Sequence, residues 1–458
     1  MSDEVYALMK QVRPLLLVCT ALITFVACPV GCGFFDSSKS TTPTATPPNF
    51  TATVVIGDSL SAGFQNGSLL DTQQPNGWAS LVAKRIGFTL TLPLIAPPGA
   101  PAVLELTSLG PPPVITQSSG TSTGRDNSTI QPNDLAVPGH QLNDVINYAP
   151  PLVPTSNEDV ITDLVLGFPI GNDKSQMNEA IALKPTALFV WAGSNDALLA
   201  DDSGSPASMT TVTTFTQQIT QLLTTLHTQT KAILVVANVP DVTAVPYLTP
   251  AATVIAEVAA ETGLSQAQVS AALGIQAGDL VNSTGLSQVQ GAVTAIKNGQ
   301  TPTPLTDSGF LDATEIAAVQ ATILQYNAAI AQQVTAVGGV LVDIHTLIAN
   351  LQQTGIAING YNATTGFLGG LFSLDGVHNT NTGYALIANQ FIDSINASLK
   401  TTFADVDVSA VAAVDPLFGP NIKATGSVVS IPRDAALSMD AVIGSKRSRA
   451  NQDHFLIN

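Results

Sequence analysis

The chain has 458 residues and a formal net charge of −17, with 45% hydrophobic and only 11% charged residues. This acidity opposes binding to nucleic acid or anionic headgroups, because like charges repel, and we expect no nucleic-acid partner. The body of the chain has no run of eighteen or more apolar residues, so we predict no membrane-spanning helix there.

The N-terminal region is typical of an export signal. Lys10 and Arg13 precede an apolar run over residues 14–27. This run is too short to span a membrane comfortably, but it suits the apolar region of a secretory signal peptide. We therefore predict a signal peptide over residues 1–27 and an exported protein, located in the periplasm or at the cell surface.

The cysteines lie close to this signal, and residues 25–28 (Phe-Val-Ala-Cys) resemble the lipobox of bacterial lipoproteins. The resemblance implies that Cys28 carries a lipid, which would be the chain's contact with a membrane. A second lipobox-like pattern ends at Cys32, and cleavage without lipidation is a third possibility. Residues 28–49 are rich in Ser, Thr and Pro and are predicted to be a tether, because they offer little apolar surface to bury.

From residue 50 onward, short apolar runs alternate with helical patterns. Strands alternating with amphipathic helices favour an α/β fold with a parallel sheet covered on both faces. The predicted strands are 53–56, 187–192, 232–237 and 339–344, and the predicted helices are about 77–86, 211–228, 312–336 and 380–399.

The predicted domain spans residues 50–400 and contains three insertions. Two Pro/Gly/Ser-rich stretches cover about 91–132 and 149–180, and an Ala/Gln/Thr-rich segment covers about 249–309. Whether this last segment acts as a lid stays open. Residues 401–458 form a C-terminal extension with one apolar stretch and a basic cluster over 446–449, which is most often a solvated tail.

A β-branched strand followed by a glycine turn presents Ser59, in the run Gly57-Asp58-Ser59-Leu60. A serine hydroxyl is a poor nucleophile until an imidazole takes its proton, so Ser59 needs a histidine. His378 stands three residues after Asp375, and this carboxylate can orient the ring and stabilise imidazolium.

Acyl transfer also needs donors directed at the developing oxyanion. The predicted strand 187–192 is followed by Gly-Ser-Asn-Asp, which would place Asn195 at the carboxyl edge of the sheet, where open α/β folds bind ligands. Residues 133–139 end in Gly139, whose N–H is a second candidate donor.

Taken together, these motifs resemble the GDSL family of lipases and acylhydrolases, within the SGNH hydrolase superfamily. The family's blocks occur in order along the chain, at 57–60, 133–139, 193–196 and 375–378. A turn over 238–241 is similar to the remaining block. The resemblance covers about residues 50–400, excluding the insertions.

The resemblance implies a three-layer α/β/α sandwich with a parallel, flavodoxin-like sheet of about five strands (the SGNH hydrolase fold), plus insertions. It implies Ser59 as nucleophile, His378 as general base and Asp375 as its support. Ser59 N–H, Gly139 N–H and the Asn195 side chain would form the oxyanion hole. It implies no metal and no organic cofactor, and a small-molecule or lipid ester as substrate.

Some features depart from the family pattern or compete with this assignment. His140 follows Gly139, where the family often has a small residue, so access to that donor is in question. His345 competes weakly for the role of base, because Asp343 and His345 would share a face at the end of a strand. Trp191 is expected in the core, close enough to Asn195 in sequence to touch a substrate.

The leading hypothesis is a secreted or lipid-anchored serine esterase or lipase acting through an acyl-enzyme. A carbohydrate O-acetylesterase of the same superfamily is the first alternative, since the sequence does not define the acyl length. A non-catalytic surface-binding lipoprotein is the second. The sequence gives no indication of oligomeric state.

Overall fold

The computed structural model describes residues 47–109, 113–168 and 173–422. The predicted signal peptide, the lipidation candidates Cys28 and Cys32, and the basic cluster over 446–449 lie outside the described residues.

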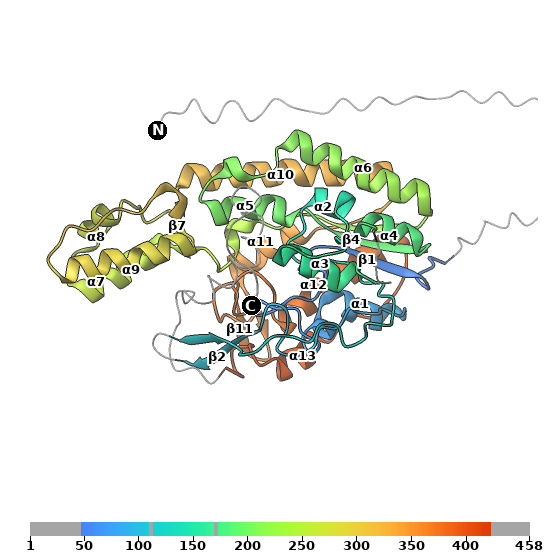
Figure 1. The fold of residues 1–458 in the computed structure, drawn as a ribbon, viewed down its shortest axis with the longest axis horizontal. Coiled ribbons are helices and arrows are strands. Elements are labelled where there is room, and N and C mark those ends of the chain that lie inside the picture. The colour runs from blue at the N-terminus through green and yellow to red at the C-terminus, as the bar shows by residue number, and fades with distance from the viewer. Residues whose placement is uncertain (1–46, 110–112, 169–172, 423–458) are drawn as a thin grey trace, which may run out of the picture. The chain divides into compact units, whose positions relative to one another are not determined.

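A parallel sheet forms the centre of the fold (Figure 1). Its strands pair in the order β1 (Thr53–Gly57), β4 (Ala187–Trp191), β5 (Ile233–Ala237) and β9 (Val340–Val342). Each strand is a short run of mostly buried apolar residues, as expected where both faces of a sheet are covered. All four predicted strands are therefore present.

The segment around Asp134 extends this sheet beyond β1. Val55 forms a parallel bridge with Asp134, and its N–H and C=O bond to Asn133 and Leu135, each at 2.9 Å. If the Asp134 segment is counted as the second strand along the chain, the strands lie side by side in the order 2-1-3-4-5. This order confirms the predicted flavodoxin-like sheet. The second strand was missing from the predicted strands, because it is reduced to a single bridge.

Helices cover both faces of the sheet, which gives the predicted three layers (Figure 1). On one face α1 packs against α12, and α12 also packs against α13, α11 and β9; on the other, α6 packs against α10, α2 and α4. The helices are α1 (Trp78–Ile86), α2 (Leu142–Asn147), α3 (Asn157–Leu166), α4 (Gln176–Ala182), α5 (Ser194–Ser203), α6 (Val212–Thr230), α10 (Ala313–Ala336), α11 (Ile344–Thr354), α12 (Asn381–Leu399) and α13 (Val408–Val414).

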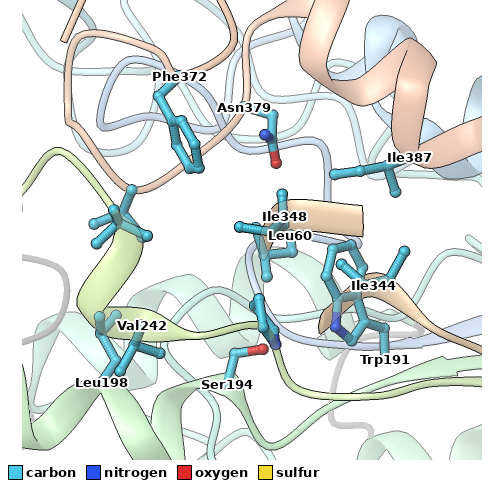
Figure 2. Close-up of a pocket in the computed structure, with 13 residues that line it drawn as sticks. Leu60, Trp191, Ser194, Leu198, Val242, Ile344, Ile348, Phe372, Asn379 and Ile387 are labelled. Carbon is cyan, nitrogen blue, oxygen red and sulfur yellow. The ribbon is translucent and has the colours of Figure 1, made fainter. Parts of the chain in front are cut away.

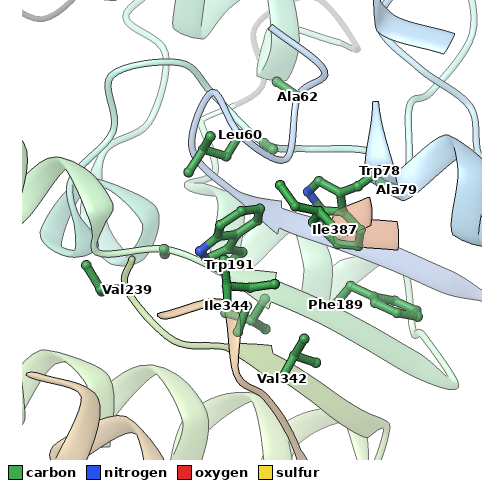
Figure 3. Packing of buried hydrophobic residues seen from close by; sticks show 14 of the residues in the cluster. Leu60, Ala62, Trp78, Ala79, Phe189, Trp191, Val239, Val342, Ile344 and Ile387 are labelled. Carbon is green, nitrogen blue, oxygen red and sulfur yellow. The ribbon is translucent and has the colours of Figure 1, made fainter. Parts of the chain in front are cut away.

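Aromatic side chains fill the space between the sheet and the layer of α1 and α12 (Figure 3). Phe189 and Trp191 are two residues apart on β4, so both project from the same face. Trp78 of α1 lies between them and α12, with its ring stacked on Phe391 at a centroid distance of 3.8 Å. Both tryptophans are buried, as predicted.

The segments interpreted as insertions contain regular structure of their own. Residues 91–132 include the antiparallel pair β2 (Leu104–Ser108) and β3 (Val114–Gln117), whereas 149–180 include α3 and most of α4. Residues 249–309 and the adjoining strand over 310–311 form a lobe that contains a separate hydrophobic core. The lobe comprises α7 (Ala251–Thr262), α8 (Gln266–Leu273) and α9 (Ser283–Lys297), with the short strands β6 (Thr249–Pro250), β7 (Leu280–Val281) and β8 (Phe310–Leu311).

The end of the fourth predicted strand differs from the prediction. The strand predicted over 339–344 ends at Val342, because the Asp343 carboxylate accepts the Thr346 N–H and caps α11. His345 therefore lies in the first turn of α11, and the expectation that Asp343 and His345 share a strand face is wrong. After α11 the chain forms the hairpin of β10 (Ile356–Ile358) and β11 (Tyr361–Ala363).

Among the described residues, no helix is long and apolar enough to cross a membrane.

The bridge beside β1 carries a buried carboxyl group. Asp134 accepts the Ala136 N–H through Oδ1, while Oδ2 has no partner among the described residues. Burial raises the pKa of Asp134 to about 8, although the hydrogen bond from Ala136 opposes the rise. At pH values between the ordinary pKa of an aspartate and this raised pKa, Asp134 holds a proton in the folded chain that it has lost in the unfolded chain.

This retained proton predicts a pH-dependent loss of stability. Because the folded state binds more protons, the free energy of unfolding falls as pH rises from about 5 to about 8. Asp134→Asn keeps the acceptor for Ala136 but cannot ionise. As pH rises across this range, the melting temperature of the wild type should therefore fall relative to that of the variant. Thermal unfolding followed by circular dichroism measures the difference. A difference between the two proteins that stays constant with pH would contradict the assignment.

Candidate active site

Ser59, His378 and Asp375 form a hydrogen-bonded series although they lie more than 300 residues apart in the chain. Ser59 Oγ is 2.7 Å from His378 Nε2, and His378 Nδ1 is 3.1 Å from Asp375 Oδ2. An ionised carboxylate only accepts hydrogen bonds, so Nδ1 carries the proton in the neutral ring and Nε2 is free to accept from the serine hydroxyl. The structure thus brings together the three residues predicted from the sequence, in the geometry of a nucleophile and its base.

The Asp375 carboxylate is fully buried and accepts several hydrogen bonds. Oδ1 accepts the N–H groups of Val377 and His378, and Oδ2 accepts the Gly67 N–H at 2.7 Å as well as the His378 ring. Burial by itself would raise the pKa of Asp375, but the charge and hydrogen bonds of His378 and the amide of Val377 hold it below the usual value. The carboxylate is therefore ionised and available to stabilise imidazolium.

A turn at Asn66-Gly67 holds the segment that contains Asp375. Both turn residues have positive φ, and Gln65 and Ser68 bond to each other across the turn. Asn66 N donates to Ser373 Oγ, and Asn66 Oδ1 accepts the Leu374 N–H, both at 3.0 Å. Asn-Gly is a strong hairpin signal in a sequence, but its partners could not be deduced from that pattern.

The turn before Ser59 depends on glycine. Gly57 has φ +153°, and a Cβ there would lie 2.1 Å from the Trp191 carbonyl oxygen. Asp58 Oδ1 accepts the Leu60 N–H, consistent with the interpretation of Asp58 as a structural acceptor in the turn. The backbone thus passes close to β4 and turns sharply, which leaves the Ser59 hydroxyl facing His378.

Hydrogen bonds link the segments that carry the predicted oxyanion donors to the turn at Gly57. Val137 N donates to the Gly57 carbonyl at 3.2 Å, which brings the segment that ends in Gly139 alongside the nucleophile turn. Asn195 Nδ2 donates to the His140 carbonyl at 2.9 Å and keeps a second hydrogen. Within the described residues, the N–H groups of Ser59 and Gly139 make no hydrogen bond, so both stay available to an oxyanion.

A buried glutamine and His140 link these groups, and neither role was foreseen. Gln176 accepts the Gly57 N–H and donates to the Gly57 carbonyl, each at 2.9 Å, and also donates to His140 Nδ1 at 3.0 Å. His140 Nε2 then faces Thr162 Oγ1 at 2.9 Å. The His140 ring is therefore held in this buried network, while its carbonyl fixes Asn195.

The remaining described histidines, His345 and His227, form no hydrogen bond with Ser59. His345, in the first turn of α11, donates its backbone N–H to Asn238 Oδ1, and His227 lies in the last turn of α6. His454 and the lipidation candidate Cys28 lie outside the described residues. The described histidine bonded to Ser59 is His378.

An apolar pocket lies beside the hydrogen-bonded series (Figure 2). Its cavity volume is about 40 Å³. Leu60 follows Ser59 in the chain, and Val377 and Asn379 flank His378. The pocket is lined by Leu60, Trp191, Ser194, Leu198, Pro240, Val242, Val245, Ile344, Ile348, Phe372, Val377, Asn379 and Ile387, none of which is ionisable.

Comparison with known proteins gives a family match. The model of the family described as GDSL-like Lipase/Acylhydrolase matches residues 53–391. No curated protein matches the chain.

Solved structures give only distant similarities. An α/β-hydrolase enzyme from the metagenome of Lake Arreo, Spain, has 12% identity over 76% of this chain and 96% of its own, with a TM-score of 0.35. A putative GDSL-like lipase from Parabacteroides merdae has 10% identity over 76% and 98%, with a TM-score of 0.33. An acetyl-xylooligosaccharide esterase from Geobacillus has 11% identity over 77% and 96%, also with a TM-score of 0.33. At these scores, the family match is the comparison that carries weight.

The Gln176 network predicts a loss of activity from a residue that does not touch Ser59. Gln176→Leu would remove the acceptor of the Gly57 N–H, one of the two donors to the Gly57 carbonyl, and the donor to His140 Nδ1, so these groups could shift. Since small displacements at a reacting centre are costly, we expect a kcat lower by about ten- to a hundredfold for an ester substrate. Steady-state kinetics, with melting temperature measured alongside, test this.

Gln74→Leu is the matched control. Gln74 is also buried and bonds to backbone groups, those of Pro93 and Ile95, so its loss should cost similar stability while kcat stays near the wild-type value. Equal kcat values for the two variants would show that the Gln176 network does not position the site.

Proposed function

The chain belongs to the family of GDSL-like lipases and acylhydrolases, and from this premise we propose that it is a serine ester hydrolase that forms an acyl-enzyme. The observation that carries the proposal is the buried series Asp375, His378 and Ser59, joined by hydrogen bonds of 3.1 Å and 2.7 Å. A serine already bonded to an oriented imidazole is prepared to lose its proton.

The proposed reaction has two steps. Ser59 Oγ attacks the ester carbonyl as His378 Nε2 takes its proton, and the tetrahedral oxyanion is stabilised by the N–H groups of Ser59 and Gly139 and by Asn195. His378 then protonates the leaving alcohol. Water, deprotonated by His378, attacks the acyl-enzyme and releases the acid with Ser59 restored. Asp375 stabilises imidazolium in both steps.

The proposed substrates are carboxylic esters with an apolar acyl chain. The pocket beside Ser59 supports this choice, because its lining is almost entirely apolar. The alternative of a carbohydrate O-acetylesterase therefore has less support, and so has a purely binding protein, which would not need the hydrogen-bonded series.

The proposal extends to location and partners. We expect an exported protein, in the periplasm or at the cell surface, with a lipid on Cys28 as its membrane contact and no nucleic-acid partner. The sequence pattern before Cys28 and the net charge of −17 support these expectations.

Replacement of the nucleophile tests the proposed activity. We expect Ser59→Ala to lower kcat/KM for chromogenic acyl esters by at least about 1,000-fold, because no other group can form the acyl-enzyme. Ser61→Ala is the matched control: Ser61 is equally buried and its hydroxyl has no partner in the described structure, so activity should persist. Undiminished hydrolysis by a folded Ser59→Ala protein would refute the proposal.

Lipid attachment has a separate test. In a bacterial host supplied with a labelled fatty acid, the full chain should become labelled, and Cys28→Ala should abolish the label. Cys32→Ala is the control and should retain it. Label that is lost only in Cys32→Ala would move the anchor to the second lipobox-like pattern, and an unlabelled wild type would indicate plain secretion.

A further inference from the structure

Two adjacent residues at the start of α9 connect the lobe over residues 249–311 to the active site. Asn282 is the N-cap of α9, and Ser283 is its first helical residue. Both are buried, with 0% and 2% of their surface exposed. Their side chains bond to groups outside the lobe, and these groups lead to the two segments that carry the candidate oxyanion donor Asn195 and the candidate base His378.

Asn282 holds the end of α5. Its Nδ2 donates to the backbone carbonyls of Asp201 at 3.0 Å and of Asp202 at 3.2 Å, both in the last turn of this helix. Asn195 lies in the first turn of the same helix. Because a helix moves largely as a rigid unit, a displacement of its last turn also displaces Asn195.

Tyr247 joins the start of α9 to the segment that carries the base. Its hydroxyl lies 3.2 Å from Ser283 Oγ, and its backbone N–H donates to the Gly376 carbonyl at 2.9 Å. Tyr247 is fully buried, so its ring cannot move without rearranging its neighbours. Gly376 follows Asp375 directly and lies two residues before His378. Its carbonyl therefore belongs to the turn that sets the distance between the Asp375 carboxylate and the His378 ring.

The contacts at α9 oppose a movement of the lobe as a lid. A lid leaves the site and returns to it during turnover. Departure of α9 would break the bonds of Asn282 to α5 and of Ser283 to Tyr247 together. The same movement would release the two segments that carry the reacting groups. A lobe attached in this way is suited to hold the site in one arrangement.

Building on the proposed function, we propose that the lobe is a fixed support of the active site and that Tyr247, Ser283 and Asn282 are positioning residues. Tyr247 and Ser283 hold the turn between Asp375 and His378, and Asn282 holds α5. These residues act on the reaction through other groups. Their loss should therefore lower kcat and leave KM near the wild-type value, because small displacements at the reacting centre slow the chemical step.

A double-mutant cycle on the bond between Tyr247 and Ser283 tests this. Tyr247→Phe and Ser283→Ala each remove one hydroxyl and keep the Tyr247 N–H that binds Gly376. For a chromogenic acyl ester, we expect kcat per active site to fall about three- to tenfold in each variant, with KM within about twofold of wild type. The double variant should lose no more than the more affected single variant, because both changes remove the same interaction. Complete titration with a fluorophosphonate counts the active sites, so that a loss of folded protein does not mimic a loss of kcat.

Asn282→Ser tests the support of α5. Serine is also a favoured N-cap residue, so α9 should keep its cap, but the serine side chain is too short to reach the α5 carbonyls. We expect the same fall of kcat per active site at constant KM. An unchanged kcat would overturn the role assigned to Asn282.

Val269→Ala is the matched control. Val269 lies on α8 and is fully buried in the separate core of the lobe. Its truncation leaves a cavity that destabilises the lobe but keeps the hydrogen bonds at the start of α9, so kcat per active site should stay at the wild-type value. An equal fall of kcat in Val269→Ala would show that the other variants act through a general loosening of the lobe, and would overturn the inference.

Three further results would contradict the inference. Unchanged kcat in both Tyr247→Phe and Ser283→Ala, or additive losses in the double variant, would show that their bond does not position the base. A higher kcat in either variant would indicate a lid whose opening limits turnover. Since Ser283→Ala removes a single oxygen atom, it keeps the test decisive if Tyr247→Phe is unstable. A wild-type protein that hydrolyses no ester would instead refute the proposed function, and this inference with it.

Discussion

The Asp375 carboxylate is the interaction on which the site depends. It is fully buried, and its two oxygens accept hydrogen bonds from Gly67, Val377 and both the backbone and the ring of His378. A buried charge is tolerated only when it is paired and hydrogen-bonded, so these donors cannot move independently of one another. The same group that stabilises imidazolium thus also joins the loop after the nucleophile to the segment that carries the base.

The sheet explains why the remaining groups meet. In a parallel sheet the carboxyl ends of all strands share one edge, and the motifs follow β1, the bridge at Asp134, and β4. Gln176 then fixes their spacing, because it bonds to both backbone groups of Gly57 and to His140, whose carbonyl holds Asn195. The apolar pocket lies at this edge as well, between the start of α5, α11 and α12 (Figure 2).

Local pattern predicted the framework well, because strands and amphipathic helices reflect residue periodicity. The four paired strands and the helices α1, α6, α10 and α12 were predicted with small errors at their ends, whereas shorter helices such as α5 and α11 were not predicted. Ser59, His378 and Asp375 were identified as a set. What could not be predicted depends on partners distant in the chain: the Asn66-Gly67 turn is a local signal, but its bonds to Ser373 and Leu374 are not. The sequence pattern places Asp343 in a strand, whereas in the structure its carboxylate caps α11. The buried orientation of His140 likewise depends on distant partners, Gln176 and Thr162.

The central claim is that Ser59 is an activated nucleophile, and covalent labelling tests it most directly. The folded protein would be treated with a fluorophosphonate, digested, and mapped by mass spectrometry. The account predicts a phosphonate adduct on the peptide that contains Ser59, because this hydroxyl is the one bonded to the His378 ring. An adduct on another serine, or an active and folded enzyme without an adduct, would contradict it.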